Sequence, residues 1–267
     1  MSDERPRPPR TALITGAAAG IGAAFAEALA REGCRLVLVD RNSERLQQIK
    51  DSLPAECETM TADLTAEGDL ARVEARCREG LDLLVNSAGF GHPTGFLATP
   101  VEAEIAMARL HTEAVLRLTL AALPSMIERG RGGVVNVASV LGFFPSSTYS
   151  ATKAWVINFS RAAAVKTLPD GVAVTALCPG FTRTEFHDSA GMNMTAIPRF
   201  LWMEADDVVS AALRDWRRRR SLSVPGWHYK AIVFLSRMLP PRLIDRVLAY
   251  ASRKPLAVRE GALRGAP

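Results

Sequence analysis

Short apolar runs alternate with helix-length amphipathic segments along most of this chain. Several of the runs are uniformly apolar rather than alternating, as expected for strands that are covered on both faces. They span 11–15, 35–39, 81–85, 133–138 and 172–178, with weaker ones near 56–60 and 222–224. Apolar residues recur at helical spacing in 21–31, 43–52, 66–78, 102–129, 150–168 and 204–219. The alternation predicts an α/β fold with a doubly wound parallel sheet of about seven strands and helices on both faces.

Three stretches of the chain differ in character. Residues 1–10 are rich in Pro and Arg and lack an apolar centre, so we expect a disordered tail and no secretory signal. Residues 11–226 contain neither a repeat nor a linker and predict one domain. Residues 227–267 form a basic extension with two short amphipathic helices, 227–239 and 242–251. With no membrane-spanning apolar stretch, we expect a cytoplasmic protein.

The net charge of +5 is unevenly distributed. From Arg214 onward there are 13 Lys and Arg against 3 Asp and Glu, whereas the preceding residues carry 20 against 25. The basic character therefore belongs to the C-terminal segment, and no binding motif with stacking aromatics accompanies it, which disfavours nucleic acid. The four cysteines are far apart, with no CxxC and no neighbouring histidines, so we expect no metal site.

A glycine-rich turn follows the first predicted strand, with Gly16, Gly20 and Gly22 in the spacing GxxxGxG. Gly16 allows a tight turn, Gly20 lets the backbone approach a phosphate, and Gly22 lets the following helix pack on the sheet. The free N–H groups at that helix start would bind a pyrophosphate. No Lys-Ser/Thr pair follows, so the turn is not a P-loop. The alternative is a tight turn without a ligand.

The second predicted strand ends at Asp40, 18 residues after Gly22. A carboxylate there accepts hydrogen bonds from ribose hydroxyls and repels a 2′-phosphate, whereas the next residue, Arg41, can pair with such a phosphate. Because Asp40 is at the strand tip itself, we favour NAD(H), with NADP(H) as the alternative.

Polar residues at later strand ends supply candidate chemistry. Asn86-Ser-Ala-Gly89 follows the fourth strand, Ser139 ends the fifth, and Tyr149-Ser-Ala-Thr-Lys153 opens the next helix. Tyr149 and Lys153 are four residues apart and therefore share a helical face. The chain has 28 Arg but only 5 Lys, so a Lys at this spacing is informative.

These motifs resemble the short-chain dehydrogenase/reductase family from about Thr11 to Thr184. The resemblance implies a Rossmann-like domain and an NAD(P)(H)-dependent oxidoreductase acting on CH–OH or C=O groups. It also implies a homodimer or homotetramer formed through the long helices. A non-catalytic dinucleotide sensor or scaffold protein is the alternative, and the presence of both Tyr149 and Lys153 argues against it.

The resemblance also implies roles for individual residues. Tyr149 is the general acid/base, with its pKa lowered by the Lys153 ammonium and the nicotinamide charge. Lys153 also binds the nicotinamide ribose, and Ser139 binds the substrate oxygen. The other matched cofactor positions are Ile21, Asp63, Leu64, Asn86, Ala88, Gly89, Pro179, Gly180, Thr182 and Thr184. The alternatives without a functional role are that Ser139 is an ordinary serine at a strand end and that Asp63 is a helix N-cap.

Two positions depart from the family pattern. His111 occupies a position where many members have an Asn that anchors a water. We predict a proton relay through Tyr149, Lys153, water and His111, with the histidine titrating near neutral pH; the alternative is a core or interface histidine. Ser139 and Tyr149 are only ten residues apart, which predicts a shortened loop, with Ser146 and Ser147 as fallback candidates.

Apolar residues in loops near the expected active site predict an apolar ketone or secondary alcohol as substrate. They are Phe143, Phe144, Phe181, Phe186, Met192 and Met194. Packing among the loops is the alternative. The C-terminal helices can cover the pocket, pack in an oligomer or contact anionic lipid; we favour packing.

Overall fold

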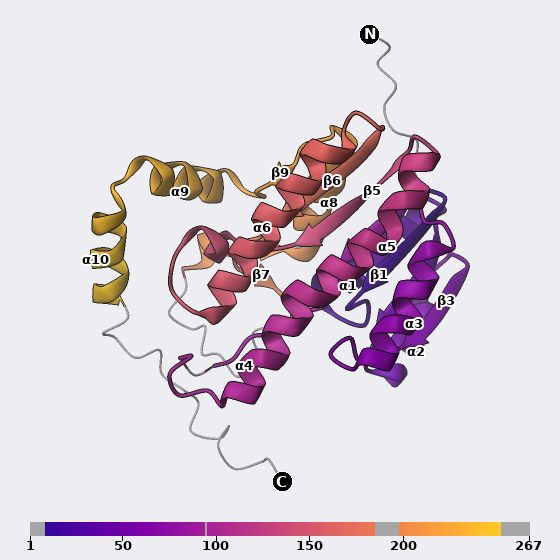
Figure 1. Ribbon diagram of the computed structural model, residues 1–267, viewed down its shortest axis with the longest axis horizontal. Helices are drawn as coiled ribbons and strands as arrows, with labels where there is room; N and C mark the ends of the chain where they lie inside the picture. Colours follow the sequence, from indigo (N-terminus) through magenta and orange to yellow (C-terminus); the bar gives the residue numbers. More distant parts are fainter. Residues whose placement is uncertain (1–8, 94, 185–197, 252–267) are drawn as a thin grey trace.

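The computed structural model describes residues 9–93, 95–184 and 198–251. A seven-stranded, entirely parallel sheet in the order β3-β2-β1-β4-β5-β6-β9 forms its centre (Figure 1). Its strands are β1 (Thr11–Thr15), β2 (Arg35–Asp40), β3 (Cys57–Thr61), β4 (Leu83–Asn86), β5 (Gly132–Val137), β6 (Val172–Leu177) and β9 (Leu222–Ser223). A separate parallel pair joins β7 (Thr182–Arg183) and β8 (Met203–Glu204). The predicted doubly wound sheet is confirmed.

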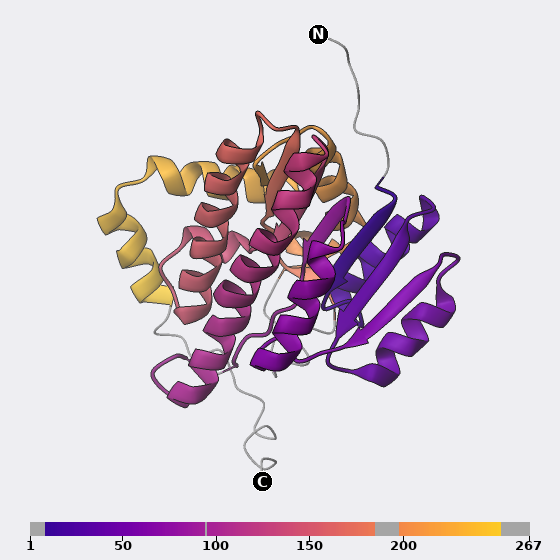
Figure 2. The same ribbon diagram turned by 45° about the vertical axis from the view of Figure 1, so that its right-hand side comes forward.

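Helices cover both faces of this sheet, as Figure 2 shows from a second direction. They are α1 (Gly20–Arg31), α2 (Ser43–Ser52), α3 (Glu67–Arg78), α4 (Val101–Ala108), α5 (Val115–Glu128), α6 (Thr148–Thr167), α8 (Ala205–Arg217), α9 (Trp227–Met238) and α10 (Pro241–Ala251). One core lies between the sheet and α1 with α8, and it contains the buried Phe25 and Trp216. The other lies under α3, α5 and α6, where Leu118 and Met126 are buried.

The long helix predicted over 102–129 is interrupted. α4 and α5 are joined by a π-helical segment, Arg109–Ala114, which contains His111. Single π turns inside helices are frequent at functional sites because they re-aim a side chain. Although a proline inside a helix often bends or ends it, Pro124 lies inside α5, which continues to Glu128. The buried Leu123 and Met126 hold this last part against the core.

The strand order reverses between β1 and β4, so two loops from distant parts of the chain meet at their carboxyl ends. The Thr15 hydroxyl oxygen accepts hydrogen bonds from the backbone N–H groups of Ser87 and Ala88, both at 3.1 Å. A Cβ on Gly16 would lie 2.8 Å from the Ala88 Cα. This reversal is where open α/β sheets bind ligands.

The C-terminal helices α9 and α10 lie at the outer edge of the molecule, on the side away from β3 (Figure 1). α9 contributes the buried Tyr229 and Val233 to a third apolar cluster with Val156 and Ile157 of α6. Within the described residues, no helix has both the length and the apolar character that crossing a membrane requires. All four cysteines are free thiols.

Candidate active site

The glycine turn between β1 and α1 has the backbone that its sequence predicts. Gly16 and Gly20 have φ angles of +67° and +56°, a region that side chains other than glycine rarely adopt. A Cβ on Gly22 would lie 2.0 Å from the Gly16 carbonyl oxygen. The N-terminus of α1, with Ile21 in its first turn, follows this turn directly. The three glycines therefore form an open cradle at a helix start, which fits a dinucleotide pyrophosphate.

Asp40 lies at the tip of β2, beside the glycine turn. One of its carboxylate oxygens accepts a hydrogen bond from the Ala18 N–H at 3.2 Å, and the other accepts from the Asn42 N–H at 3.0 Å. Each oxygen keeps a second lone pair with which it can accept from a ribose hydroxyl. Arg41 is exposed at the start of the following turn.

Asp63 organises the turn between β3 and α3. Its carboxylate accepts from both the backbone N–H and the hydroxyl of Thr65, at 2.9 and 2.7 Å. The helix begins later, at Glu67, so Asp63 shapes the approach to α3 without being its N-cap. Leu64 is buried, whereas Asp63 is exposed at the same sheet edge as Asp40.

Asn86 points into the protein from the end of β4. Its amide nitrogen donates to Asn136 Oδ1 at 2.8 Å and to Thr119 Oγ1 at 3.2 Å. Asn136 in turn donates to the Ser160 hydroxyl of α6 at 2.9 Å. This buried chain ties β4 and β5 to α5 and α6 beneath the site. The sequence prediction missed Asn136, although a single amide inside the apolar run of β5 is a recognisable signal.

Tyr149 is brought to Ser139 by the first turn of α6. Ser147 caps this helix: its hydroxyl accepts from the Ser150 N–H, while the Ser150 hydroxyl accepts from the Ser147 N–H. The side chains of Tyr149 and Ser139 are hydrogen bonded. A short 3₁₀ turn, Val140–Phe143, accommodates the ten-residue separation. Ser139 is therefore not displaced, and Ser147, one of the fallback candidates, serves in the helix cap.

Burial dominates the electrostatics of the Tyr149–Lys153 pair. Desolvation raises the pKa of Tyr149 to about 12, while the Ser139 hydrogen bond acts in the opposite direction. Desolvation also lowers the pKa of Lys153 to about 8. Lys153 Nζ donates to the Val137 carbonyl at 2.9 Å and lies 5.6 Å from the centre of the Tyr149 ring. In the protein chain alone, burial therefore raises the pKa of Tyr149 rather than lowering it, because desolvation outweighs the Ser139 hydrogen bond. The lowering that we predicted also involves the nicotinamide charge and stays a prediction for the cofactor-bound protein.

His111 faces the same cluster from the π-helical segment, with 1% of its surface exposed. The Thr152 hydroxyl donates to the Tyr149 carbonyl oxygen at 2.8 Å. Its oxygen must therefore accept from His111 Nδ1, 2.9 Å away, which assigns the proton to Nδ1. Nε2 is then a bare acceptor, and it is buried without a partner among the described residues.

The unpartnered Nε2 atom of His111 and the Nζ atom of Lys153 both lie next to Gly89. A Cβ on Gly89 would lie 2.9 Å from His111 Nε2 and 3.6 Å from Lys153 Nζ, so glycine leaves the space between them open. Burial, and secondarily the charge of Lys153, holds the pKa of His111 well below its usual 6.5. The prediction that His111 titrates near neutral pH is therefore wrong: the ring stays neutral and can act only as an acceptor at Nε2.

The loop after β6 brings Pro179–Thr184 toward the glycine turn. A Cβ on Gly20 would lie 3.2 Å from the Thr184 Cβ, so Thr184 closes against that turn. Thr182 is buried and donates its hydroxyl proton to the Gly180 carbonyl at 3.1 Å. Of the two threonines, Thr184 is thus the one that contacts the glycine turn.

Tyr229 of α9 anchors this loop, and the sequence prediction missed it. Its hydroxyl accepts from the Phe181 N–H at 2.9 Å and donates to the Leu201 carbonyl at 2.7 Å. A Cβ on Gly180 would lie 1.9 Å from the Tyr229 Cζ, so the ring packs directly on the glycine. An aromatic residue with a polar tip on an amphipathic helix gives no sequence signal for this distant partner.

The structure describes three of the six apolar residues that were predicted near the site. Phe143 and Phe144 are half-buried beside the 3₁₀ turn, and Phe181 packs against Trp202 with ring centres 5.9 Å apart. The predicted residues Phe186, Met192 and Met194 lie outside the described residues.

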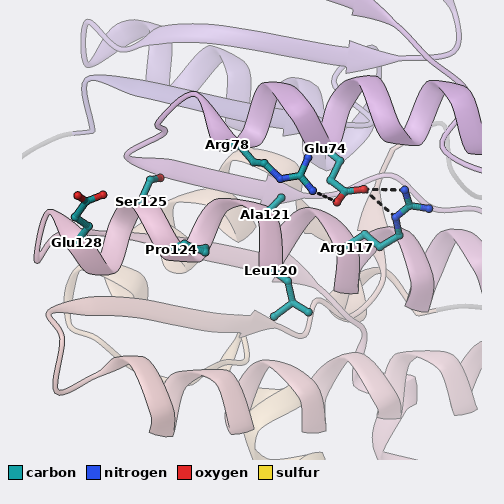
Figure 3. A pocket seen from close by; sticks show the side chains of 8 residues that line it. All are labelled: Glu74, Arg78, Arg117, Leu120, Ala121, Pro124, Ser125 and Glu128. Atoms are coloured by element: carbon teal, nitrogen blue, oxygen red, sulfur yellow. Dashed lines mark hydrogen bonds and ion pairs between the residues drawn. The ribbon is translucent and has the colours of Figure 1, made fainter.

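A surface groove of about 460 Å³ lies elsewhere, between α3 and α5 (Figure 3). In this groove Glu74 is held between Arg78 and Arg117, with the Arg117 pair at 2.7 Å. Arg117 also pairs with Glu67 at 2.8 Å. Glu74, Arg78 and Arg117 are thus held in ion pairs, and the groove contains none of the candidate catalytic residues.

The parallel sheet, glycine cradle and Ser–Tyr–Lys cluster define a dinucleotide-dependent oxidoreductase. The family model described as short chain dehydrogenase matches residues 10–194, so the chain belongs to that family. Like its relatives, it is an NAD(P)-dependent oxidoreductase that acts on CH–OH groups.

Two solved structures are similar over nearly the whole chain. A short-chain dehydrogenase from Sphingobium yanoikuyae in complex with NADPH is 35% identical, with a TM-score of 0.77, covering 96% of this chain and 98% of that one. A bulky-bulky ketone specific alcohol dehydrogenase from Comamonas testosteroni is 30% identical, with a TM-score of 0.73, covering 97% of each. A 2,5-dichloro-2,5-cyclohexadiene-1,4-diol dehydrogenase from Sphingobium indicum is 34% identical over 66% of this chain and 74% of its own.

Proposed function

We propose that this protein interconverts a secondary alcohol and a ketone on a largely apolar skeleton, with Tyr149 as the general acid/base. The observation that carries the proposal is the convergence of Tyr149 with the buried Ser139, Lys153 and His111 at one point on the carboxyl edge of the sheet. The bound nicotinamide cofactor supplies or accepts the hydride, and the protein supplies orientation and the proton.

In the reducing direction, the Tyr149 hydroxyl gives its proton to the substrate oxygen as that oxygen gains negative charge. Ser139, hydrogen bonded to Tyr149, donates to the same oxygen and stabilises its charge. A raised pKa keeps Tyr149 protonated and ready to donate at neutral pH. The phenolate that remains is stabilised by the Lys153 ammonium, which lies above the ring.

A proton from solvent returns to Tyr149 through a water held by His111: Lys153 passes its proton to the phenolate and regains one from this water, which solvent reprotonates. The water donates to the bare His111 Nε2 and accepts from Lys153 Nζ, across the opening that Gly89 leaves. The histidine positions this water without itself changing protonation state, since its pKa is held low. This version of the relay replaces the titrating histidine that the sequence suggested.

The surroundings of the site support an apolar substrate. Phe143, Phe181 and Trp202 present aromatic surface near the 3₁₀ turn and the Gly180 loop. The relative from Comamonas testosteroni is named for bulky ketones, and that from Sphingobium indicum for a chlorinated cyclic diol. Turnover confined to small polar sugars or polyols in a substrate panel would contradict this assignment.

NAD(H) is the proposed preferred cofactor because the Asp40 carboxylate lies at the strand tip, beside the glycine turn. The Sphingobium yanoikuyae structure contains NADPH, so the preference needs a direct measurement. We expect Asp40→Ser to weaken NADH binding by about tenfold and to narrow or reverse the preference in fluorescence titrations with both reduced cofactors. Tighter binding of NADPH by the wild-type protein would contradict the proposal.

A homodimer or homotetramer through the long helices is proposed for the assembly. Leu120, which lines the groove of Figure 3, and Ile127, also on α5, are 54% and 37% exposed and offer apolar surface for a second copy. Light scattering on the wild-type protein and on Leu120→Glu tests this. A wild-type monomer would contradict it.

The central experiment is Tyr149→Phe. This change keeps the ring and removes the proton donor, so turnover is expected to fall by about a thousandfold while reduced-cofactor binding stays unchanged. Turnover is measured by cofactor oxidation with bulky ketones. Cofactor binding without turnover in the wild-type protein across the ketone panel would instead support a dinucleotide-binding sensor.

A further inference from the structure

The outer face of α9 carries large apolar side chains that are exposed in the part of the chain that the structure describes. Trp227, Phe234 and Met238 are 81%, 64% and 68% exposed. Their spacing of seven and four residues places them in one line along the helix. Tyr229 and Val233, which are 3% and 5% exposed, face the core from the opposite side. Packing on the protein therefore explains one apolar face of α9 and leaves the second unexplained.

Basic residues accompany this second face. Residues 227–251 contain four basic residues and one acidic residue, and the sequence 252–267 adds four basic and one acidic. Lys230, Arg242 and Arg246 are exposed, and no ion pair neutralises them within the part of the chain that the structure describes. Arg237 packs over the Phe143 ring at 5.2 Å instead of pairing with a carboxylate.

We propose that α9 and α10 dock on the surface of a bilayer that contains anionic lipid, with the Trp227–Phe234–Met238 line inserted at the interface. Exposed aromatic and aliphatic side chains flanked by Lys and Arg are the composition of helices that lie in a membrane surface. Each cation near such a surface is attracted to the anionic headgroups. The helices lie at the outer edge of the molecule in both views, where a flat surface can reach them.

Charge favours lipid over a second copy of the chain on this face. A twofold contact would place the same basic residues of both copies against each other, with Asp245 as the one described acid to offset them on each side. Anionic headgroups complement the same residues without this repulsion. The outer face of α9 is therefore more complementary to an anionic bilayer than to the same face of a second copy of the chain.

Docking would place the active site beside the bilayer. Phe143, under the Arg237 guanidinium, ends the 3₁₀ turn that begins directly after Ser139. An apolar ketone dissolved in the membrane could then reach the site without crossing water. This part of the inference rests on the proposed function, whereas binding to lipid does not.

The test is co-sedimentation of the full-length protein with vesicles of phosphatidylcholine alone or mixed with phosphatidylglycerol. We expect the wild-type protein to sediment with the mixed vesicles, to bind the neutral ones much less and to be released by salt. The double variant Phe234→Glu/Met238→Glu is expected to reduce partitioning by about tenfold or more. Val165→Glu, which changes a 73%-exposed apolar residue on α6, is the matched control and should bind as the wild type does.

Three outcomes would overturn the proposal. The wild-type protein could remain in the supernatant with both vesicle types, or the double variant could bind as tightly as the wild type. Alternatively, light scattering could show that the double variant splits an oligomer that does not bind vesicles, which would make this face a protein interface. Tyr149→Phe should retain vesicle binding, so failure of the proposed chemistry and failure of lipid docking give different results.

Discussion

The carboxyl edge of the sheet buries polar side chains, whereas the C-terminal helix α9 exposes large apolar ones. At the edge, the polar Lys153 and His111 are 5% and 1% exposed. On α9, the apolar Phe234 and Met238 are 64% and 68% exposed. Burying polar groups and exposing large apolar ones both cost stability, so neither arrangement is explained by folding alone. Our proposals give each region a partner other than the protein itself: reacting atoms for the first and a lipid surface for the second.

Lys153→Met probes the buried side of this comparison and should have the largest effect. Removing the ammonium is expected to lower kcat by about a thousandfold. Because burial disfavours the charged lysine, the variant should melt at a temperature no lower than that of the wild type. Lys166→Met, an exposed position on the same helix, is the control and should change neither property.

The same substitution has a predicted pH dependence. With a folded pKa of about 8 against 10.5 for the free side chain, the wild-type protein gains stability relative to Lys153→Met as pH rises between these values. The difference in unfolding free energy is therefore expected to be largest below pH 8 and to shrink toward pH 10.5. If denaturant titrations gave a constant difference over this range, burial would not lower the pKa of Lys153.

His111→Leu should lower turnover by about tenfold by removing the acceptor at Nε2, whereas His111→Asn should restore part of it. Since the buried ring resists protonation, the wild-type protein should lose stability relative to His111→Asn as pH falls below 6.5. Its rate profile should show no inflection that depends on His111. Such an inflection near neutral pH would support the original prediction that His111 itself gains and loses a proton in the relay.

Tyr229→Phe tests how far the two regions are connected. Loss of the hydroxyl leaves the Phe181 N–H and the Leu201 carbonyl without their partner, at an expected cost of about 1–3 kcal/mol. We also expect the cofactor KM to rise a few-fold, because the Gly180 loop is less firmly held. A drop in melting temperature with an unchanged KM would limit Tyr229 to a structural role.

Phe234→Glu should have the smallest effect on folding. The side chain is exposed, so the melting temperature should stay within about 1 °C of the wild-type value, corresponding to a few tenths of a kcal/mol. A clear destabilisation in thermal melts would mean that the outer face of α9 packs against the protein after all.

The fold was predictable because strands and helices leave periodic patterns. The apolar runs and their alternation with helices gave the parallel sheet, and the spacing of Tyr149 and Lys153 placed them together on α6. The tight turn at Gly16 and Gly20 could be predicted because backbone positions with a positive φ angle favour glycine, which is visible in the sequence.

Features that depend on contacts between distant residues were not predictable. Asn86, Asn136 and Ser160 are joined across elements by side-chain hydrogen bonds, which local spacing does not encode. The direction of the Tyr149 and His111 pKa shifts follows from burial, which only the packed structure reveals. The π-helical turn at His111 likewise interrupts a pattern that looked continuous.

The packing of Tyr229 on Gly180 also bears on how such proteins diversify. A Cβ at position 180 would lie 1.9 Å from the tyrosine ring, so the two positions are expected to change together among relatives. A C-terminal segment exchanged between relatives would have to bring a compatible partner for residue 180. A chain shortened at Gly226 would lose this anchor along with the outer face of α9. We therefore expect the C-terminal helix α9 and the loop at Gly180 to vary together and not independently.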